Sequence, residues 1–249
     1  MLLRIRIQNF LSFQKETTFD MLTDPKIEGL PHHISKDTPL PLLKQAAIYG
    51  ANGAGKSNLI KTFVFLKNWV TNPKCLEEIE VCDYSFRMTD EDTKPPICLE
   101  VEFLSHQKAY LYKVAISEES IEESLYLSGL GKSADTLIFE RKDSKLIKHS
   151  LLNESAINEL LTANKKASLL VLHQGLGASY NPELKAAYEW FDEQLQIVKY
   201  PSDYTQLTKQ LTSDEKLFDF VEDIIQSCDL DIDGIEREEN SDELLFLQY

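Results

Sequence analysis

Few features of this sequence point to a membrane, a secreted scaffold or a repetitive fibre. The chain has no uninterrupted apolar run of roughly 18 residues, the length that a membrane-spanning helix requires. Its 9 glycines and 9 prolines are too few for a collagen-like or low-complexity composition. Arg4, Arg6, Gln8 and Asn9 interrupt the apolar start, so residues 1–13 lack the central segment of a signal peptide. We therefore expect a cytoplasmic protein.

Residues that could hold a metal are also sparse. The 4 cysteines show no C-x-x-C spacing and no histidine at zinc-ligand distance, so we expect reduced thiols. Residues 229–234 begin like a calcium-binding loop, but Asn240 stands where that loop requires a glutamate, and a short strand is the alternative. His32 and His33 have no third ligand near them in the sequence, which favours an ordinary loop. The cysteines are Cys75, Cys82, Cys98 and Cys228.

Positive charge is in deficit. The chain has 26 Lys and Arg against 41 Asp and Glu, a net charge of -15. Sequence-independent DNA binding draws its affinity from clustered cations, so this composition argues against direct DNA binding. The acidity is concentrated in residues 181–249, which contain 18 acidic and 5 basic side chains. This segment is either a solvated helical face or a docking surface for a basic partner.

Length and hydrophobicity, by contrast, suffice for a folded core. A chain of 249 residues that is 43% hydrophobic can form one large or two small domains. Leu3, Ile5 and Ile7 alternate with polar residues, as in a half-buried strand, and the spacing after Lys56 is helical. Strands are predicted at residues 3–8, 17–22 and 42–49, a loop at residues 23–40, and a helix from residue 56 to the Asn72-Pro73 pair.

The rest of the chain shows alternation first and helical spacing later. Short polar turns separate alternating segments between residues 97 and 141, which predicts an antiparallel meander. Asn181 is suited to cap a helix that starts at Pro182, and Ser213 to open a further helix. Meander strands are predicted at residues 97–103, 110–116, 121–127 and 137–141, a helix at residues 154–161, and a buried strand at residues 168–172.

Residues 50–57 carry the most specific motif. They read Gly-Ala-Asn-Gly-Ala-Gly-Lys-Ser, which satisfies the phosphate-loop pattern G-x-x-x-x-G-K-[ST], between a predicted strand and a predicted helix. Glycines let backbone N–H groups turn toward phosphates, and the helix N-terminus adds positive potential. Lys56 would reach the β- and γ-phosphates, and the Ser57 hydroxyl would ligate Mg²⁺. The sequence therefore predicts ATP and Mg²⁺ as ligands.

The phosphate loop and the first strand together resemble a known family. Residues 5–13 read Ile-Arg-Ile-Gln-Asn-Phe-Leu-Ser-Phe, and residues 48–59 read Ile-Tyr-Gly-Ala-Asn-Gly-Ala-Gly-Lys-Ser-Asn-Leu. These strings are similar to the N-terminal lobe of the ABC-type ATPase heads of SMC and RecF proteins. They are more closely similar to the AAA-type ATP-binding proteins of bacterial abortive-infection and phage-defence systems. The resemblance implies an α/β P-loop NTPase of ABC-ATPase-head type, with residues 1–180 as the nucleotide-binding lobe that includes the meander and residues 181–249 as the start of a helical lobe.

The resemblance also suggests roles for individual residues. Leu11 and Ser12 match the segment that approaches the nucleotide in such heads, although residues 9–13 could simply end a strand. Gln174 follows an apolar run, where these heads place a glutamine that reaches Mg²⁺ and the attacking water; an exposed loop glutamine is the alternative. Lys56 and Gln174 are the candidate catalytic residues, and Ser57 and Gln174 the candidate metal ligands. The predicted nucleotide-binding residues are Leu11, Ser12, Asn52, Gly53, Ala54, Gly55, Lys56, Ser57 and Asn58.

Two parts of the ABC-head pattern are missing from the sequence. The family needs a serine-glycine loop that opens a helix, and an Asp-Glu pair after a strand end of four apolar residues. Residues 127–133 imitate the serine-glycine loop but lie between meander strands, so we interpret them as a hairpin turn. Asp242 and Glu243 precede their apolar run instead of following it. We therefore interpret the chain as the N-terminal part of a longer ATPase head, whose hydrolysis needs the remainder of that head and a partner subunit.

Several functions are compatible with these features. The leading hypothesis is a nucleotide-gated sensor or effector-holding scaffold in antiphage defence, which forms a homo-oligomer around ATP and controls a nuclease or toxin. The alternatives are a non-catalytic nucleotide-binding module, an SMC- or RecF-like DNA-repair ATPase, and a small-molecule P-loop kinase. The strand-rich segment after the loop disfavours the kinase. The lack of a basic stripe or a long heptad region disfavours DNA repair.

Overall fold

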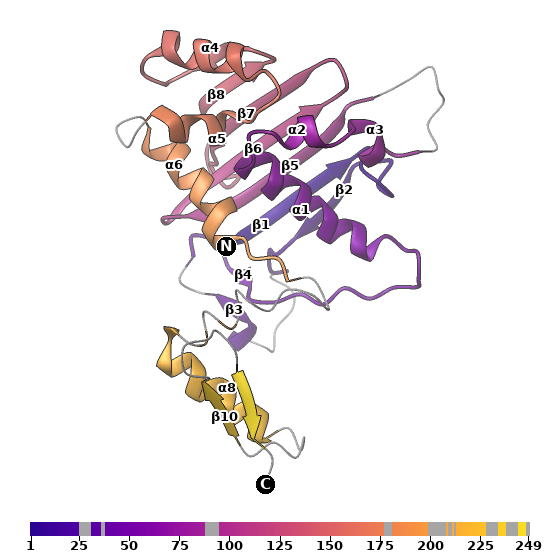
Figure 1. Cartoon of the computed structure of the whole chain (residues 1–249), viewed down its shortest axis with the longest axis vertical. Coiled ribbons are helices and arrows are strands. Elements are labelled where there is room, and N and C mark those ends of the chain that lie inside the picture. The colour runs from indigo at the N-terminus through magenta and orange to yellow at the C-terminus, as the bar shows by residue number, and fades with distance from the viewer. Residues whose placement is uncertain are drawn as a thin grey trace. The chain divides into compact units, whose positions relative to one another are not determined.

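The contacts of the chain divide it into two compact units, Met1–Gln196 and Ile197–Tyr249. The computed structural model, drawn in Figure 1, describes residues 1–24, 31–35, 38–87, 95–176, 181–198, 208, 211, 213–227, 234–237 and 244–247. The division falls further along the chain than residue 180, because helix α6 (Pro182–Glu189) contacts strand β5 (Ile97–Ser105) of the first unit.

A seven-stranded sheet forms the centre of the first unit. Its strand order is β2-β1-β5-β6-β7-β8-β9, and every neighbouring pair is antiparallel. The first two strands and the meander are therefore confirmed, and β9 adds a strand that the sequence did not predict. Besides β5, the strands are β1 (Leu2–Gln8), β2 (Thr17–Asp20), β6 (Lys108–Ile116), β7 (Ile121–Leu127), β8 (Thr136–Lys142) and β9 (Lys145–His149).

One face of this sheet is covered by helices. Helix α1 (Lys56–Thr71) lies across it, as Figure 1 shows, and buries Leu59, Phe63, Leu66 and Trp69. Each such side chain contributes about 1.5–3 kcal/mol of hydrophobic stabilisation when it is fully buried. The residues that alternate with the buried ones in the strands face the opposite side of the sheet.

Shorter helices complete the helical layer. The Asn181 side chain accepts a hydrogen bond from Glu183 N at 2.8 Å, so the predicted cap of α6 is confirmed, with Pro182 as its first residue. The predicted helix at residues 154–161 is α4. The remaining helices are α2 (Cys75–Glu78), α3 (Val81–Tyr84), α4 (Glu154–Ala163), α5 (Leu169–Leu172), the 3-10 helix η2 (His173–Leu176) and the π-helix η3 (Trp190–Gln194).

Two strand predictions are wrong. Residues 168–172 form helix α5, because the Ser168 hydroxyl accepts a hydrogen bond from Leu170 N and caps it. A short apolar run has no period that separates a buried strand from a buried helix. Of residues 42–49 only Leu42–Leu43 form a strand, β4, which pairs with β3 (Ile34–Ser35) after the 3-10 helix η1 (Pro31–His33).

The segment that precedes the phosphate loop is exposed. Tyr49 has an exposed fraction of 90% and Ile48 of 43%. An apolar run becomes a strand only where neighbouring strands bond its backbone and bury its side chains. None of the described strands pairs with residues 44–49.

The second unit contains helix α8 (Glu215–Ser227) and a hairpin of β10 (Gly234–Arg237) and β11 (Leu244–Leu247). The predicted helix is confirmed, but it starts at Glu215 instead of Ser213. The Asp214 carboxylate accepts hydrogen bonds from Lys216 N at 3.1 Å and Leu217 N at 3.2 Å, and so caps it. Residues 229–233, Cys228, Asp242 and Glu243 lie outside the described residues.

Candidate functional site

The phosphate loop leads directly into α1. Gly53 and Gly55 have φ angles of 81° and 89°, left-handed values that glycine adopts without steric cost. Gly55 is the residue before the helix, and its carbonyl oxygen accepts hydrogen bonds from Asn58 N at 2.9 Å and Leu59 N at 3.2 Å. The two glycines therefore bend the backbone around the N-terminus of α1, where helix N–H groups favour an anion.

Lys56 closes the loop on itself. Its Nζ atom donates hydrogen bonds to the carbonyl oxygens of Gly50 and Ala51, each at 2.7 Å. These bonds hold the ammonium group against the loop, at the positive end of the helix dipole. A phosphate group that entered the loop would offer the ammonium a charged acceptor in place of two neutral carbonyls.

The turn after β1 touches this loop. Phe10 and Phe13 exchange backbone hydrogen bonds of 3.1 and 2.8 Å, so Leu11 and Ser12 form the tip of a tight turn. A Cβ atom added to Gly55 would lie only 2.6 Å from Ser12 Oγ. The structure thus brings the predicted segment at residues 11–12 to the predicted phosphate loop.

Aromatic packing fixes the position of this turn. The Phe10 ring lies 5.4 Å from the Phe65 ring of α1 and 5.8 Å from the Tyr84 ring of α3. Leu11 N donates a 2.7 Å hydrogen bond to Tyr84 O, and Leu11 has the left-handed φ of 49°. Sequence reasoning found the turn but missed Tyr84, which stands outside both strings that carried the resemblance.

A buried polar network anchors the other end of α1. Trp69 Nε1 donates to Tyr112 Oη at 2.8 Å, and Tyr112 Oη donates to Glu123 Oε1 at 2.6 Å. Glu123 also accepts from Ser168 Oγ at 2.6 Å and forms a fully buried ion pair with Arg141. Burial, together with the Glu123 charge, raises the pKa of Tyr112 well above its ordinary value, so its hydroxyl stays a donor.

The same network locates Gln174. Ser168 precedes α5, and Gln174 follows it in η2, where its side chain is exposed. The network joins this region to Trp69, which lies about 20 Å along the helix from Lys56 at a rise of ~1.5 Å per residue. The described contacts do not bring Gln174 to the phosphate loop, and its role toward Mg²⁺ stays a prediction.

The structure also bears on the other patterns that the sequence analysis considered. Residues 128–135 connect β7 to β8, so the interpretation of residues 127–133 as a hairpin turn is confirmed. His32 and His33 lie in η1, and the described residues contain no cluster of three or more His, Cys, Asp or Glu side chains that could hold a metal. No helix in the described part of the chain is both long and apolar enough to cross a membrane.

The loop offers the groups that a nucleotide phosphate requires. Residues 50–54 and Ser57 are exposed, so an anion has free access from solution. Residues 50–57 bring together three features that favour an anion: the left-handed glycines, the start of α1 and the Lys56 ammonium. This donor set fits a phosphate chain, and the Ser57 hydroxyl at the first turn of the helix is of the kind that ligates Mg²⁺.

Comparison with known proteins agrees with this geometry. Residues 46–247 match the family model described as "AAA domain, putative AbiEii toxin, Type IV TA system". No curated protein matches the chain at a significant level. The match includes the phosphate loop, α1 and the strands of the meander. The chain therefore belongs to this family of AAA domains, which are P-loop ATP-binding domains.

Proposed function

We propose that the chain binds Mg²⁺-ATP at the N-terminus of α1. The observation that carries the proposal is the contact between Ser12 and Gly55, which joins the two segments of the family resemblance at one loop. Lys56 would leave the carbonyls of Gly50 and Ala51 and pair with the β- and γ-phosphates. Ser57 would ligate the metal, which neutralises phosphate charge when it is bound. The residues assigned to the nucleotide are Leu11, Ser12, Asn52, Gly53, Ala54, Gly55, Lys56, Ser57 and Asn58.

Titration calorimetry with Mg²⁺ and a non-hydrolysable ATP analogue tests this proposal. Lys56→Ala should weaken binding at least ~10-fold, because it removes a charge-assisted contact to phosphate. Lys61→Ala is the matched control, since Lys61 is an exposed lysine on the same helix and its loss changes the net charge equally. Equal affinity of Lys56→Ala and the unaltered chain would refute the proposed site.

We further propose that residues 1–249 alone hydrolyse ATP at no more than a residual rate. The loop supplies binding groups, but no Asp-Glu pair follows a run of four apolar residues in this sequence to orient the attacking water. Gln174 is the candidate for a metal contact, and it would have to approach the loop on nucleotide binding. A Lys56-dependent steady-state rate of ~1 s⁻¹ or more from the isolated chain, typical of working enzymes, would overturn this part.

The biological role that we propose is a nucleotide-gated sensor or effector-holding scaffold in antiphage defence. The support is the family description, which names a toxin of a toxin–antitoxin system, and the acidic segment at residues 181–249, which suits a basic partner protein. A phosphate loop covers one side of a triphosphate, so we propose a homo-oligomer with ATP between subunits. Light scattering at low salt, with and without the analogue, tests this: a monomer in both conditions would favour an isolated binding module instead.

A further inference from the structure

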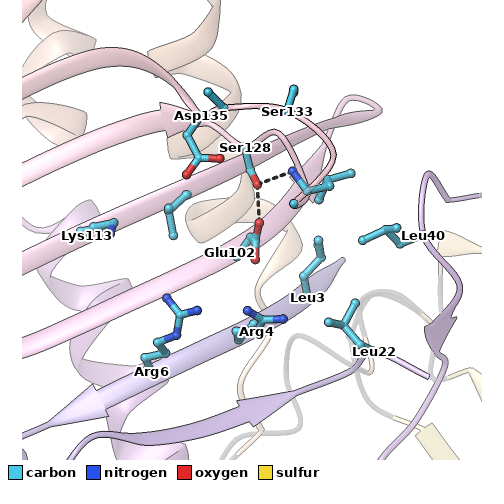
Figure 2. Close-up of a pocket in the computed structure, with 14 residues that line it drawn as sticks. Leu3, Arg4, Arg6, Leu22, Leu40, Glu102, Lys113, Ser128, Ser133 and Asp135 are labelled. Carbon is cyan, nitrogen blue, oxygen red and sulfur yellow. Dashed lines mark hydrogen bonds between the residues drawn. The ribbon is translucent and has the colours of Figure 1, made fainter. Parts of the chain in front are cut away.

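A cavity opens on the face of the sheet opposite α1. Its volume is about 440 Å³, within the range of small-molecule sites, and none of residues 50–58 lines it. Arg4, Glu102 and Leu111 form one row across strands β1, β5 and β6, since Arg4 pairs with Glu102 and Glu102 with Leu111. These side chains alternate with the buried ones that face the helices, and Figure 2 shows Arg4 and Glu102 at the floor of the cavity.

The neighbouring row of charges is partly neutralised by one shared carboxylate. The Glu100 carboxylate accepts from Arg6 Nη1 at 2.8 Å and lies 3.3 Å from Lys113 Nζ. Arg6 and Lys113 also line the cavity, but they share this carboxylate. They therefore offer a ligand less free charge than their number suggests.

Arg4 differs from both. Its Nε atom is buried without a hydrogen-bond partner, and its guanidinium forms no ion pair with any described residue. The directly opposite residues in register are Asp20 and Glu102, both acidic, yet neither carboxylate lies within ion-pair distance. An arginine N–H that is withdrawn from water and left unbonded at the floor of a cavity indicates an acceptor supplied by a ligand.

Two carboxylates that line the cavity with Arg4 each have one oxygen already engaged. Glu102 Oε1 accepts a hydrogen bond from Ser128 Oγ, drawn as a dashed line in Figure 2. Asp135 Oδ1 accepts from Gly129 N at 2.9 Å. The second oxygen of each carboxylate can accept a donor from a ligand. The cavity thus offers a cation that lacks an acceptor, next to acidic groups with remaining acceptor capacity.

The remaining wall is apolar and held in place. Leu22, Leu40 and Leu130 line it. Leu130 belongs to the β7–β8 turn, where its N–H donates to Ser128 Oγ at 3.1 Å. A Cβ atom on Gly129 would lie 2.1 Å from Ser133 O, so the turn closes tightly around this glycine. A preformed wall lowers the ordering cost of binding.

We propose that this cavity binds a small zwitterion with an apolar side chain, of the α-amino-acid class. The carboxylate of the ligand pairs with Arg4, its ammonium group pairs with Glu102 and Asp135, and its side chain lies against Leu22, Leu40 and Leu130. The charges that line the cavity favour a ligand with both signs over a simple anion, because Glu102 and Asp135 repel an anion and attract an ammonium group. Nucleotide plays no part in this proposal, so its outcome is independent of the proposed ATP site.

Four probes, each tested on the whole chain by NMR, separate the three contacts. L-leucine carries all three groups, 4-methylpentanoate lacks the ammonium, 3-methylbutylamine lacks the carboxylate, and glycine lacks the side chain. The readout is the ¹H–¹⁵N resonance of Arg4 Nε, assigned by its loss in Arg4→Gln. Leucine should shift this resonance saturably and bind at least ~10-fold more tightly than either analogue that lacks a charged group. Leucinamide and N-acetylleucine mimic the N- and C-terminal residues of a peptide and keep one charge each, so both should bind as weakly as the other single-charge analogues.

Variants make the proposal falsifiable even if one of them folds poorly. Arg4→Gln should abolish leucine binding, measured by ligand-observed NMR, whereas Lys142→Gln, on the exposed pair of β8 with Glu122, should preserve it. Glu102→Gln should lower the affinity for leucine toward that for 4-methylpentanoate, with Asp135 left as the one acidic partner of the ammonium group. The proposal is overturned if 4-methylpentanoate binds as well as leucine, or if no probe at ~10 mM, a concentration that suffices for a millimolar Kd, shifts the Arg4 resonance.

Discussion

The ion pair between Glu123 and Arg141 has a matched neighbour on the same two strands. In the register of β7 and β8, Glu123 faces Arg141 and Glu122 faces Lys142. Successive strand residues point to opposite faces. The side chains of the first pair are therefore buried, with 0% exposure, whereas those of the second are 56% exposed. One substitution, Glu→Gln, at two adjacent positions compares the same charge change with and without burial.

Glu123→Gln should lower the free energy of unfolding by about 3–5 kcal/mol, the cost of leaving one charge of a buried pair uncompensated. Four groups donate to the carboxylate: Tyr112 Oη, Ser168 Oγ, Leu169 N and Arg141 Nε. A glutamine side chain of the same shape keeps one acceptor oxygen and places an NH₂ group against the remaining donors. Because a domain has roughly 5–15 kcal/mol of total stability, this loss would be a large part of it.

Urea unfolding followed by tryptophan fluorescence measures the effect, since Trp69 belongs to the same network. Glu122→Gln, whose Lys142 partner is 56% exposed, should leave the midpoint unchanged within error. If Glu123→Gln and Glu122→Gln have equal midpoints and equal slopes, the network does not anchor α1 to the sheet.

Three further outcomes follow from single positions. Gly55→Ala should abolish binding of the ATP analogue in calorimetry, because the residue needs a φ of 89° and its Cβ would meet Ser12 Oγ at 2.6 Å; retained binding would contradict the tight loop. Gly129→Ala should lower the melting temperature, since its Cβ would lie 2.1 Å from Ser133 O, and an unchanged value would show that the turn can open. Burial lowers the pKa of His173 from 6.5, so the unfolded chain takes up this proton first as the pH falls. The free energy of unfolding should therefore decrease below pH 6.5, and His173→Gln should show less of that decrease.

Periodicity was sufficient for six of the seven strands of the sheet, all but β9, and not for the segments whose structure depends on neighbours. Leu3, Ile5 and Ile7 alternate strictly, and β1 has the predicted face. Residues 168–172 are apolar at every position, so only the Ser168 cap decides between helix and strand. Residues 44–49 end in Ile48 and Tyr49, which favour strands, but backbone groups also need a partner strand, and composition does not provide one.

The candidate site divides in the same way. The phosphate-loop residues are contiguous, so the sequence alone predicted a glycine-dependent turn of the backbone and the start of α1 at Lys56. The packing of Tyr84 against the turn after β1 is a contact between distant segments. Whether the Arg4 guanidinium finds a partner also depends on residues far from it in the sequence. A strand pattern reports which face a side chain occupies, but it does not report whether its charge finds a partner there.

The pairing of β1 with β5 has a consequence for synthesis on the ribosome. Ile5 lies opposite Val101 in the sheet, and the phosphate loop and α1 are translated between these two strands. A nascent chain that ends before Ile97 therefore contains the complete phosphate loop but only the β1–β2 pair of the sheet that α1 covers. Tyr112, which accepts the hydrogen bond from Trp69, and Glu123, which accepts the one from Tyr112, emerge later still. Closing such a long loop delays folding, so ATP capture should begin only after most of the meander has left the ribosome.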